Sequence, residues 1–335
     1  MRLLILGGTE FVGRAVTEAA VARSCEVTVF NRGSRPVPAG VRVLRGDRTA
    51  PDGLAALADG EWDLVVDTWS ADPGPVRDAA RLLAERAGRY AYVSSRSVYT
   101  WPAPAGAAED APVVAGAGPD ETGVPYPEAK RGGELAALDA FGPDRTLLAR
   151  AGLILGPWEN IGRLPWWLRR IARGGPVLAP GPRELPLQYI DARDLAGWLL
   201  TAAGAGLSGA YDLVSPPGHT TMGELLDTCV RVTGADAELR WTEPEKILAA
   251  GITPWTELPV WSPPGWENGA YEAMHRSDPG KARAAGLRCR PVAETVADTW
   301  AWLRAADGTD RTGPEPARRA MGLPAEKEAE VLNGG

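Results

Sequence analysis

Short apolar runs alternate with stretches of helical periodicity over the first 150 residues of the chain. This alternation predicts parallel strands joined by right-handed helical crossovers. The strands are uninterrupted apolar runs, as expected when helices cover both faces of a sheet. The expected strands are 3–6, 26–30, 41–44, 64–66, 90–94 and 146–150, and the expected helices are 11–22, 76–87 and 127–141. The pattern predicts an α/β fold with a doubly wound parallel sheet.

The pattern changes after Gly156, where proline, glycine and tryptophan become frequent. Further strands are expected at 187–190 and 211–214, and further helices at 192–203 and 222–233. We therefore expect a first domain at 1–156 and a smaller C-terminal α/β substrate domain at 157–304, partly interleaved with the first. Residues 305–335 are polar, and we expect a mobile tail with a short helix near 326–332.

Length and charge narrow the class of protein. The 335 residues suit one large domain or two smaller ones, and the net charge of -7 argues against a nucleic-acid partner. No stretch approaches the roughly 18 apolar residues of a membrane span, and the N-terminal apolar run is too short for a signal peptide. Three scattered cysteines without a C-x-x-C pair predict neither disulfides nor a metal site. We expect a cytoplasmic protein that acts on a small molecule, without nucleic-acid or membrane partners.

A glycine-rich loop separates the first expected strand from the first expected helix. Its glycines allow a tight turn, and the helix N-terminus that follows offers unpaired N–H groups to a pyrophosphate. This context predicts that residues 1–156 form a dinucleotide-binding Rossmann domain, and a plain strand-to-helix turn is the alternative. The residues expected to contact the dinucleotide here are Gly7, Gly8, Thr9, Phe11, Val12 and Gly13.

The end of the second expected strand decides the cofactor. An NAD site would place an acidic residue here to accept from the adenosine 2′-hydroxyl. The chain instead has Asn31 with Arg32, Ser34 and Arg35 beside it. Because guanidinium groups match a phosphate dianion, this turn predicts NADP, with NAD the less favoured cofactor and a solvated basic turn the alternative.

Three polar residues near the ends of expected elements suggest acid–base chemistry. Ser95 follows the fifth strand, where α/β sheets bind ligands, and Tyr126 and Lys130 lie one turn apart at the start of a helix. A neighbouring ammonium lowers the pKa of a phenol because it favours the phenolate. Lys130 is one of only four lysines in the chain. The three residues would supply a proton donor, its activator and a hydrogen-bond donor to a carbonyl oxygen.

With these motifs, residues 1–304 resemble the extended short-chain dehydrogenases/reductases, the NAD-dependent epimerase/dehydratase family. The resemblance also includes Glu109-Asp110, the segments 150–157 and 189–196, and the closing Asp278…Gly286-Leu287…Pro291…Trp300. It implies that Tyr126 is the general acid/base, that Ser95 polarises the substrate oxygen, and that Lys130 holds the nicotinamide ribose and lowers the Tyr126 pKa. It also implies that Asp47 contacts the adenine and that Thr68 and Trp69 line the cofactor. A homodimer through helices 76–87 and 127–141 is common in the family.

The chain departs from the family pattern at several places. Glu10 stands where the glycine loop usually has its central glycine, which places the chain in a less typical branch. Arg96 and Ser97 replace the Asp-Glu pair that nucleotide-sugar dehydratases carry, which argues against dehydration. Leu153 replaces the asparagine with which epimerases bind a substrate pyrophosphate, which argues against a nucleotide-sugar substrate.

The aromatic and charged residues of the second domain are candidates for a substrate pocket. Trp101, Trp158, Trp166 and Trp167 are expected as pocket walls, with burial in a core as the alternative. The alternatives for Arg163, Arg169, Arg170 and Arg173 are a grip on an anionic substrate and a solvated helix face, and we favour the latter. His219 and His275 are expected to be structural.

The sequence therefore predicts an NADPH-dependent reductase of the extended short-chain type that transfers hydride to a carbonyl or imine carbon. The tryptophans suggest a hydrophobic or aromatic substrate such as a natural-product ketone. A nucleotide-sugar epimerase with retained NAD is the alternative enzyme, and a non-catalytic redox sensor or RNA-associated protein is the third interpretation. The sequence does not identify the substrate.

Overall fold

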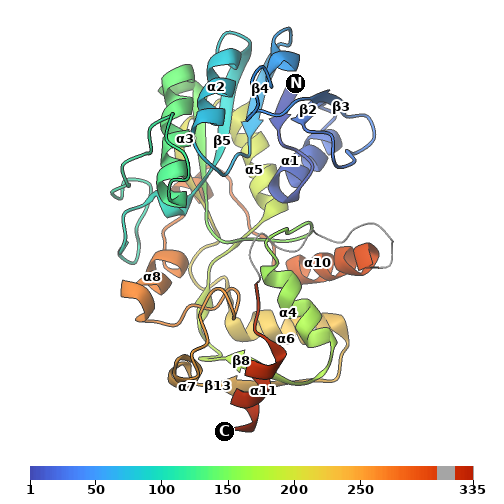
Figure 1. The fold of residues 1–335 in the computed structure, drawn as a ribbon, viewed down its shortest axis with the longest axis vertical. Helices are drawn as coiled ribbons and strands as arrows, with labels where there is room; N and C mark the ends of the chain where they lie inside the picture. The colour runs from blue at the N-terminus through green and yellow to red at the C-terminus, as the bar shows by residue number, and fades with distance from the viewer. Residues whose placement is uncertain (308–320, 335) are drawn as a thin grey trace.

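The computed structural model describes residues 1–307 and 321–334. A seven-stranded parallel sheet lies at the centre of its first domain, in the order β11-β6-β5-β4-β1-β2-β3 (Figure 1). Its strands are β1 (Arg2–Leu6), β2 (Glu26–Asn31), β3 (Arg42–Arg45), β4 (Trp62–Asp67), β5 (Ala87–Ser95), β6 (Thr146–Ala151) and β11 (Gly209–Leu213). The chain order reverses between β1 and β4, which is where doubly wound sheets bind ligands beyond their carboxyl ends. The predicted α/β fold with a doubly wound parallel sheet is confirmed.

Helices cover both faces of this sheet. On one face α1 (Phe11–Ala22) packs against α5 (Ala192–Gly204), and on the other α2 (Gly74–Leu83) packs against α3 (Tyr126–Phe141). Strand β1 shows why its apolar run is continuous: Leu3 and Ile5 belong to the core under α1 and α5, whereas Leu4 and Leu6 belong to the core under α2 and α3. Alternate side chains of a strand point to opposite faces, so a doubly covered strand needs apolar residues at every position.

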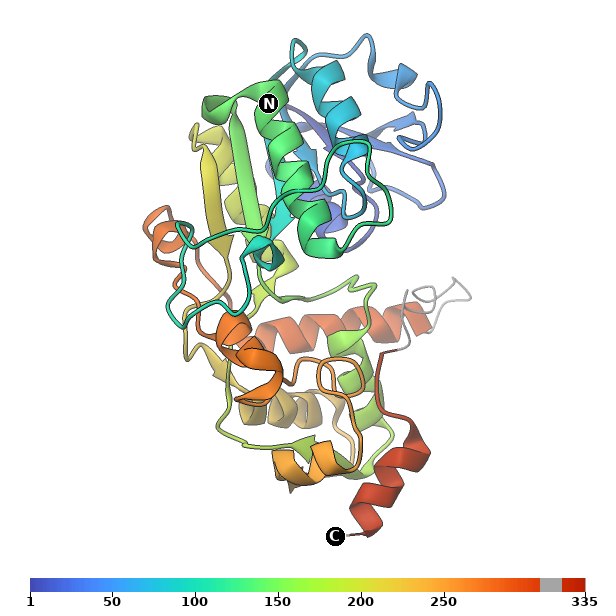
Figure 2. The same cartoon turned by 60° about the vertical axis from the view of Figure 1, so that its left-hand side comes forward.

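The second domain packs helices around its own core and lies beyond the carboxyl ends of the strands (Figures 1 and 2). Side chains of α4, α6 and α10 and of the strand pair β8–β13 meet in this core. Its elements are α4 (Arg163–Ala172), β8 (Gly175–Pro180), α6 (Met222–Thr233), β13 (Ala237–Thr242), α7 (Pro244–Ala249), α8 (Ala270–His275) and α10 (Val292–Asp307). Helix α9 (Gly280–Ala284) instead packs against β11 at the edge of the main sheet. Short 3₁₀ turns occur at Ala55–Leu57, Arg96–Val98, Pro143–Arg145 and Trp266–Asn268.

The boundary between the domains differs from a simple cut after residue 156. Strand β11, within the predicted substrate domain, is the edge strand of the main sheet beside β6, and α5 covers that sheet. The expected strand 187–190 is two short strands, β9 (Pro186–Leu187) and β10 (Ile190–Asp191). They pair with β12 (Thr220–Thr221) and β7 (Ile154–Leu155), respectively. The expected helix 76–87 ends at Leu83, because β5 already begins at Ala87.

The C-terminal helix α11 (Ala325–Asn333) is part of the folded second domain. The buried Glu328 carboxylate accepts hydrogen bonds from Arg170 Nε at 2.6 Å and from the Leu178 amide at 3.1 Å. The expectation of a mobile tail is therefore wrong for 321–334, where buried charge pairing outweighs the polar composition. Residues 305–307 end α10, and 308–320 lie outside the described residues.

Within the described ranges, no helix has the length and apolar character to cross a membrane. These residues also contain no group of three or more His, Cys, Asp or Glu side chains arranged to hold a metal ion.

Candidate active site

The glycine loop is closely packed against the strands beside it. Gly7 has φ +117°, and a Cβ there would lie 2.4 Å from Thr68 Oγ1. A Cβ on Gly13 would lie 2.6 Å from the Gly8 amide nitrogen. A side chain at either position would displace the neighbouring strand end or the loop itself, so both positions require glycine.

Helix α1 starts directly after this loop. Its N-cap residue Glu10 makes no side-chain cap, and its first turn contains no acidic residue. The side chains of Phe11 and Val12 are buried in the core, so they offer a ligand only their backbone N–H groups. An uncapped helix N-terminus with a close glycine turn fits a pyrophosphate.

The residues predicted to contact the adenosine end lie at the end of β2 and directly after it. Asn31 Oδ1 accepts a hydrogen bond from the Gly33 amide at 2.7 Å, whereas its buried Nδ2 has no partner among the described residues. Arg32 and Ser34 are exposed, and Arg35 Nε lies 2.6 Å from a Glu10 carboxylate oxygen. The orphaned amide and the neighbouring guanidinium groups fit the hydroxyl or phosphate of an adenosine ribose.

Asp47, Thr68 and Trp69 complete the predicted cofactor site. The Asp47 carboxylate accepts hydrogen bonds from Thr49 Oγ1 and the Thr49 amide, and these bonds lower its pKa. Thr68 Oγ1 donates to the Leu6 carbonyl at 3.0 Å, which places it against the glycine loop. The Trp69 indole donates to the Asp72 carbonyl at 2.8 Å. The contacts of Asp47 are local, whereas the Trp69 carbonyl accepts hydrogen bonds from the Tyr92 hydroxyl and from Lys130 Nζ.

Ser95 and Tyr126 come together although 30 residues separate them in the sequence. Ser95 ends β5 and its Oγ accepts a hydrogen bond from the Ser97 amide at 3.1 Å, while Tyr126 begins α3. Tyr126 is 46% exposed. Desolvation of its hydroxyl raises the pKa of Tyr126, and a hydrogen bond with Ser95 and the charge of Arg163 oppose this rise. The phenol is therefore protonated at neutral pH and open to a substrate.

Lys130 extends from α3 into the sheet. It is 2% exposed, and its Nζ donates to the carbonyls of Trp69 at 2.5 Å and Val93 at 2.6 Å. Burial lowers the pKa of Lys130 to about 7, against the opposing charges of Asp67 and Glu134. Desolvation, Ser95 and Arg163 account for the shift in the Tyr126 pKa, so the expectation that Lys130 lowers this pKa stays a prediction. Tyr126 and Lys130 lie one turn apart on α3. The Lys130 ammonium nevertheless points to the carbonyls of Trp69 and Val93.

Two buried ion pairs connect the strands and the helix that carry this site. The carboxylate of Asp67, at the end of β4, accepts hydrogen bonds from Arg48 Nη1 and Nη2 and from the Tyr90 hydroxyl. On α3, Glu134 accepts Arg150 Nε at 2.9 Å and the Ser94 hydroxyl at 2.7 Å, which ties the helix to β5 and β6. Sequence reasoning missed Asp67 and Glu134 as partners, because only the sheet order brings β4, β5 and β6 together.

The predicted tryptophan walls divide into two groups. Trp167 is fully buried, and its indole donates to the Pro259 carbonyl at 2.7 Å, so its assignment to the pocket is wrong. Trp166 is partly buried against the same core, edge-on to Trp167. Trp158 and Trp101 are exposed, and the Arg14 guanidinium lies 4.7 Å from the Trp158 ring centroid. Trp101, Trp158 and the partly buried Trp166 stay candidates for contact with a substrate.

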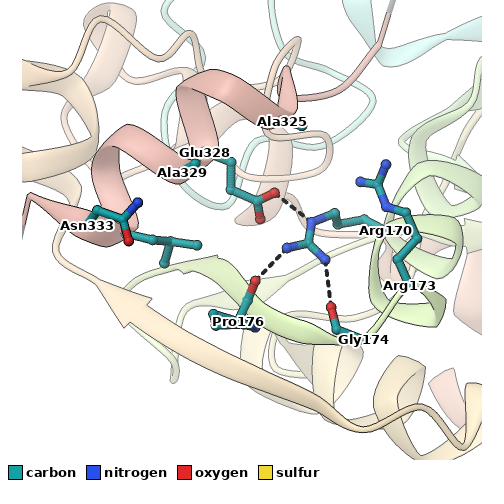
Figure 3. Close-up of a pocket in the computed structure, with 9 residues that line it drawn as sticks. Arg170, Arg173, Gly174, Pro176, Ala325, Glu328, Ala329 and Asn333 are labelled. Carbon is teal, nitrogen blue, oxygen red and sulfur yellow. Dashed lines mark hydrogen bonds and ion pairs between the residues drawn. The ribbon is translucent and has the colours of Figure 1, made fainter.

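A separate pocket lies between the end of α4, β8 and α11 (Figure 3). The Arg170 guanidinium in its wall is satisfied by Glu328 and by the carbonyls of Gly174 and Pro176. His275, also expected to be structural, is fully buried; its Nδ1 accepts from the Gln188 amide, and burial lowers its pKa to about 4. Neither feature belongs to the Ser95–Tyr126 site.

The glycine loop, the sheet order and the switch point define a dinucleotide-binding α/β protein, with the NAD(P)-binding fold. The model of the NAD dependent epimerase/dehydratase family matches residues 3–212. The chain belongs to this family.

Two curated proteins are similar in sequence. The 2′-dehydrokanamycin reductase of Streptomyces kanamyceticus is 32% identical over 194 residues, which is 53% of this chain and 51% of that protein. The chain thus matches about half the length of that relative. The 2-alkyl-3-oxoalkanoate reductase of Stenotrophomonas maltophilia is 29% identical over 270 residues, 70% of this chain and 76% of that protein.

Solved structures with the same fold cover nearly the whole chain. The UDP-glucose 4-epimerase of Thermus thermophilus in complex with NAD has a TM-score of 0.65 at 21% identity, covering 91% of this chain and 100% of that one. The Bordetella bronchiseptica enzyme WbmG in complex with NAD and UDP has a TM-score of 0.65 at 18% identity, covering 93% of this chain and 97% of that one. At these identities the likeness concerns the fold.

Proposed function

We propose that the protein is an NADPH-dependent reductase that converts a carbonyl, or an imine, of a small hydrophobic or aromatic molecule to the alcohol or amine. The observation that carries the proposal is the pairing of the Ser95 hydroxyl, at the carboxyl end of β5, with the Tyr126 hydroxyl, whose pKa is raised by desolvation. The names of both curated relatives, each a reductase, agree with this direction of reaction.

Tyr126 acts as the general acid in this proposal. Its raised pKa keeps the hydroxyl protonated at neutral pH, so it can give its proton to the substrate oxygen while Ser95 donates a hydrogen bond to the same oxygen. The reduced dinucleotide, when bound, supplies the hydride. For a ketone, the C=O π bond breaks as its carbon gains hydride and its oxygen gains the Tyr126 proton, and Tyr126 then recovers a proton from water. In this proposal Lys130, whose Nζ donates to the carbonyls of Trp69 and Val93, also orients the nicotinamide ribose.

The preference for NADP rests on the turn after β2. The orphaned Asn31 amide and the guanidinium groups of Arg32 and Arg35 favour a 2′-phosphate, and no acidic residue follows β2 directly to accept from a 2′-hydroxyl. Glu10 pairs with Arg35 and therefore opposes this preference in part.

A titration of the purified protein with NADPH and NADH tests the proposal, after absorbance has shown whether nucleotide is already bound. We expect tight, exchangeable NADPH, weaker NADH, and NADPH oxidation with a panel of aromatic ketones. Arg32→Ala and Arg35→Ala should weaken NADPH by at least tenfold and NADH little, with the exposed Arg231→Ala as control. Equal weakening of both nucleotides would refute the choice of NADP.

The second candidate is a nucleotide-sugar epimerase with retained NAD, which the NAD complexes of similar fold favour. Leu153, largely buried in the apolar core of the second domain, lacks the polar group expected for a substrate pyrophosphate. NAD that copurifies and does not exchange would support the epimerase and overturn the reductase.

A further inference from the structure

Arg163, the first residue of α4, acts electrostatically on the proposed catalytic tyrosine. Its positive charge lowers the pKa of Tyr126, and the Tyr126 hydroxyl in turn acts on Arg163, so the two groups are electrostatic neighbours. Arg163 comes from the second domain and Tyr126 from the first, so the pair spans the two domains at the reaction centre.

The guanidinium of Arg163 has no hydrogen-bond partner among the described residues, and its Nε is completely buried. The charge of the nearby Glu159 acts on this guanidinium, but the Glu159 carboxylate oxygens accept hydrogen bonds from the backbone amides of Arg163 at 2.7 Å and Leu164 at 3.1 Å and not from the guanidinium. A buried guanidinium nitrogen without a hydrogen-bonding partner is costly and calls for an explanation. An anionic ligand would supply the hydrogen-bond acceptors that the Arg163 guanidinium lacks.

An aromatic ring holds this guanidinium in place. The Arg163 Cζ lies 5.3 Å from the ring centroid of Trp255, whose amide donates to the Trp261 carbonyl at 2.9 Å. Trp255 has φ +64°, a left-handed conformation that is strained for a tryptophan. Stacking on a ring uses the face of the guanidinium and leaves the N–H groups at its edge for a ligand.

We propose that Arg163 binds a carboxylate of the substrate, so that the reductase proposed above acts on keto acids. A guanidinium binds a carboxylate through two parallel hydrogen bonds. A phosphate dianion would require more positive charge than this place offers, because the charge of Glu159 acts on the same guanidinium. The reduction of the ketone group rests on the proposed function. The binding of the carboxylate by Arg163 does not depend on it.

Binding without turnover tests Arg163 directly. Octanoate and methyl octanoate are titrated calorimetrically into the protein with NADP⁺ bound. We expect octanoate to bind the wild type at least tenfold more tightly than the ester, and Arg163→Gln to remove this preference. Arg173→Gln, which changes an exposed arginine just after the same helix, should keep it. Equal binding of acid and ester to the wild type, or an unchanged preference in Arg163→Gln, would overturn the proposal.

Turnover separates this inference from the reductase itself. We expect the wild type to reduce 3-oxooctanoate or 4-oxooctanoate with a higher kcat/KM than the corresponding methyl ester. Arg163→Gln should lower kcat/KM for the acid at least tenfold and kcat/KM for the ester less than threefold. Reduction of ketones without any preference for the acid would refute the role of Arg163 and leave the reductase standing. Arg163-dependent binding of octanoate without reduction of any ketone would refute the reductase alone.

Discussion

The Glu10 carboxylate of the glycine loop lies 2.6 Å from Arg35 Nε. It therefore forms an ion pair with the arginine that we propose as a ligand of the 2′-phosphate of NADP. The second Glu10 oxygen accepts from Asn160 Nδ2 at 2.8 Å, which joins the loop to the second domain. A carboxylate here also repels the pyrophosphate expected at the N-terminus of α1. If Arg35 binds the 2′-phosphate as proposed, that phosphate competes with the Glu10 carboxylate for the guanidinium.

Glu10→Gln should tighten NADPH by about three- to tenfold, or about 0.7–1.4 kcal/mol. The neutral amide removes the repulsion and frees Arg35 from its ion pair with Glu10. NADH should gain less, because it lacks the 2′-phosphate. Fluorescence titrations with both nucleotides measure the effect, and Glu18→Gln, which removes an exposed carboxylate from α1, is the control. Weaker NADPH binding in Glu10→Gln would show that Glu10 supports the cofactor.

Tyr126→Phe should lower kcat for ketone reduction by about 10²- to 10⁴-fold, the usual contribution of a general acid. NADPH affinity should change less than about twofold, because Lys130 and the glycine loop are unaltered, and the exposed position of Tyr126 makes a loss of fold unexpected. Steady-state kinetics and a nucleotide titration on the same preparation separate the two effects. A variant with full activity would remove Tyr126 from the mechanism.

The sequence predicted the first domain well because each of its strands carries a local signal. The helices 11–22 and 222–233 were placed at their observed bounds, since apolar periodicity specifies a helix and its flanking residues stop it. The placement of β11 beside β6 was not predicted, because strand pairing over 60 residues leaves no local trace. The homodimer through α2 and α3 stays a prediction.

The sequence identified candidate residues of the site, but it did not predict which residues of α4 lie near them. Ser95 and Tyr126 were paired by their motif, and the structure brings them together. The burial of Trp167 and the electrostatic contact between Arg163 and Tyr126 were not foreseen, because which face of α4 packs inward depends on α6 and α10. Periodicity describes a helix, but its neighbours decide which of its residues meet the site.

Glu328→Ala should destabilise the protein by about 3 kcal/mol, as expected for removing one partner of a buried ion pair. The change leaves the Arg170 guanidinium and the Leu178 amide without their acceptor in the second domain. Urea denaturation of the wild type and the variant measures the difference. Glu330→Ala, at an exposed position of α11, should change the free energy of unfolding by less than about 0.5 kcal/mol. Equal effects of both substitutions would mean that α11 adds no specific stability.

Lys130 should make stability depend on pH. Burial lowers its folded-state pKa to about 7 from the ordinary 10.5, so between these values the unfolded chain carries a proton that the folded chain lacks. Stability therefore rises with pH across this window, by up to about 1.4 kcal/mol per pH unit from this one group. In Lys130→Met that contribution is absent, whereas all other titrating groups are kept. Urea unfolding at pH 7, 8 and 9 should show the wild type gaining stability relative to Lys130→Met at each step, and Lys246→Met, at an exposed lysine, should follow the wild type. Parallel curves for the wild type and Lys130→Met would mean that Lys130 keeps its proton in the folded state, held by the charges of Asp67 and Glu134.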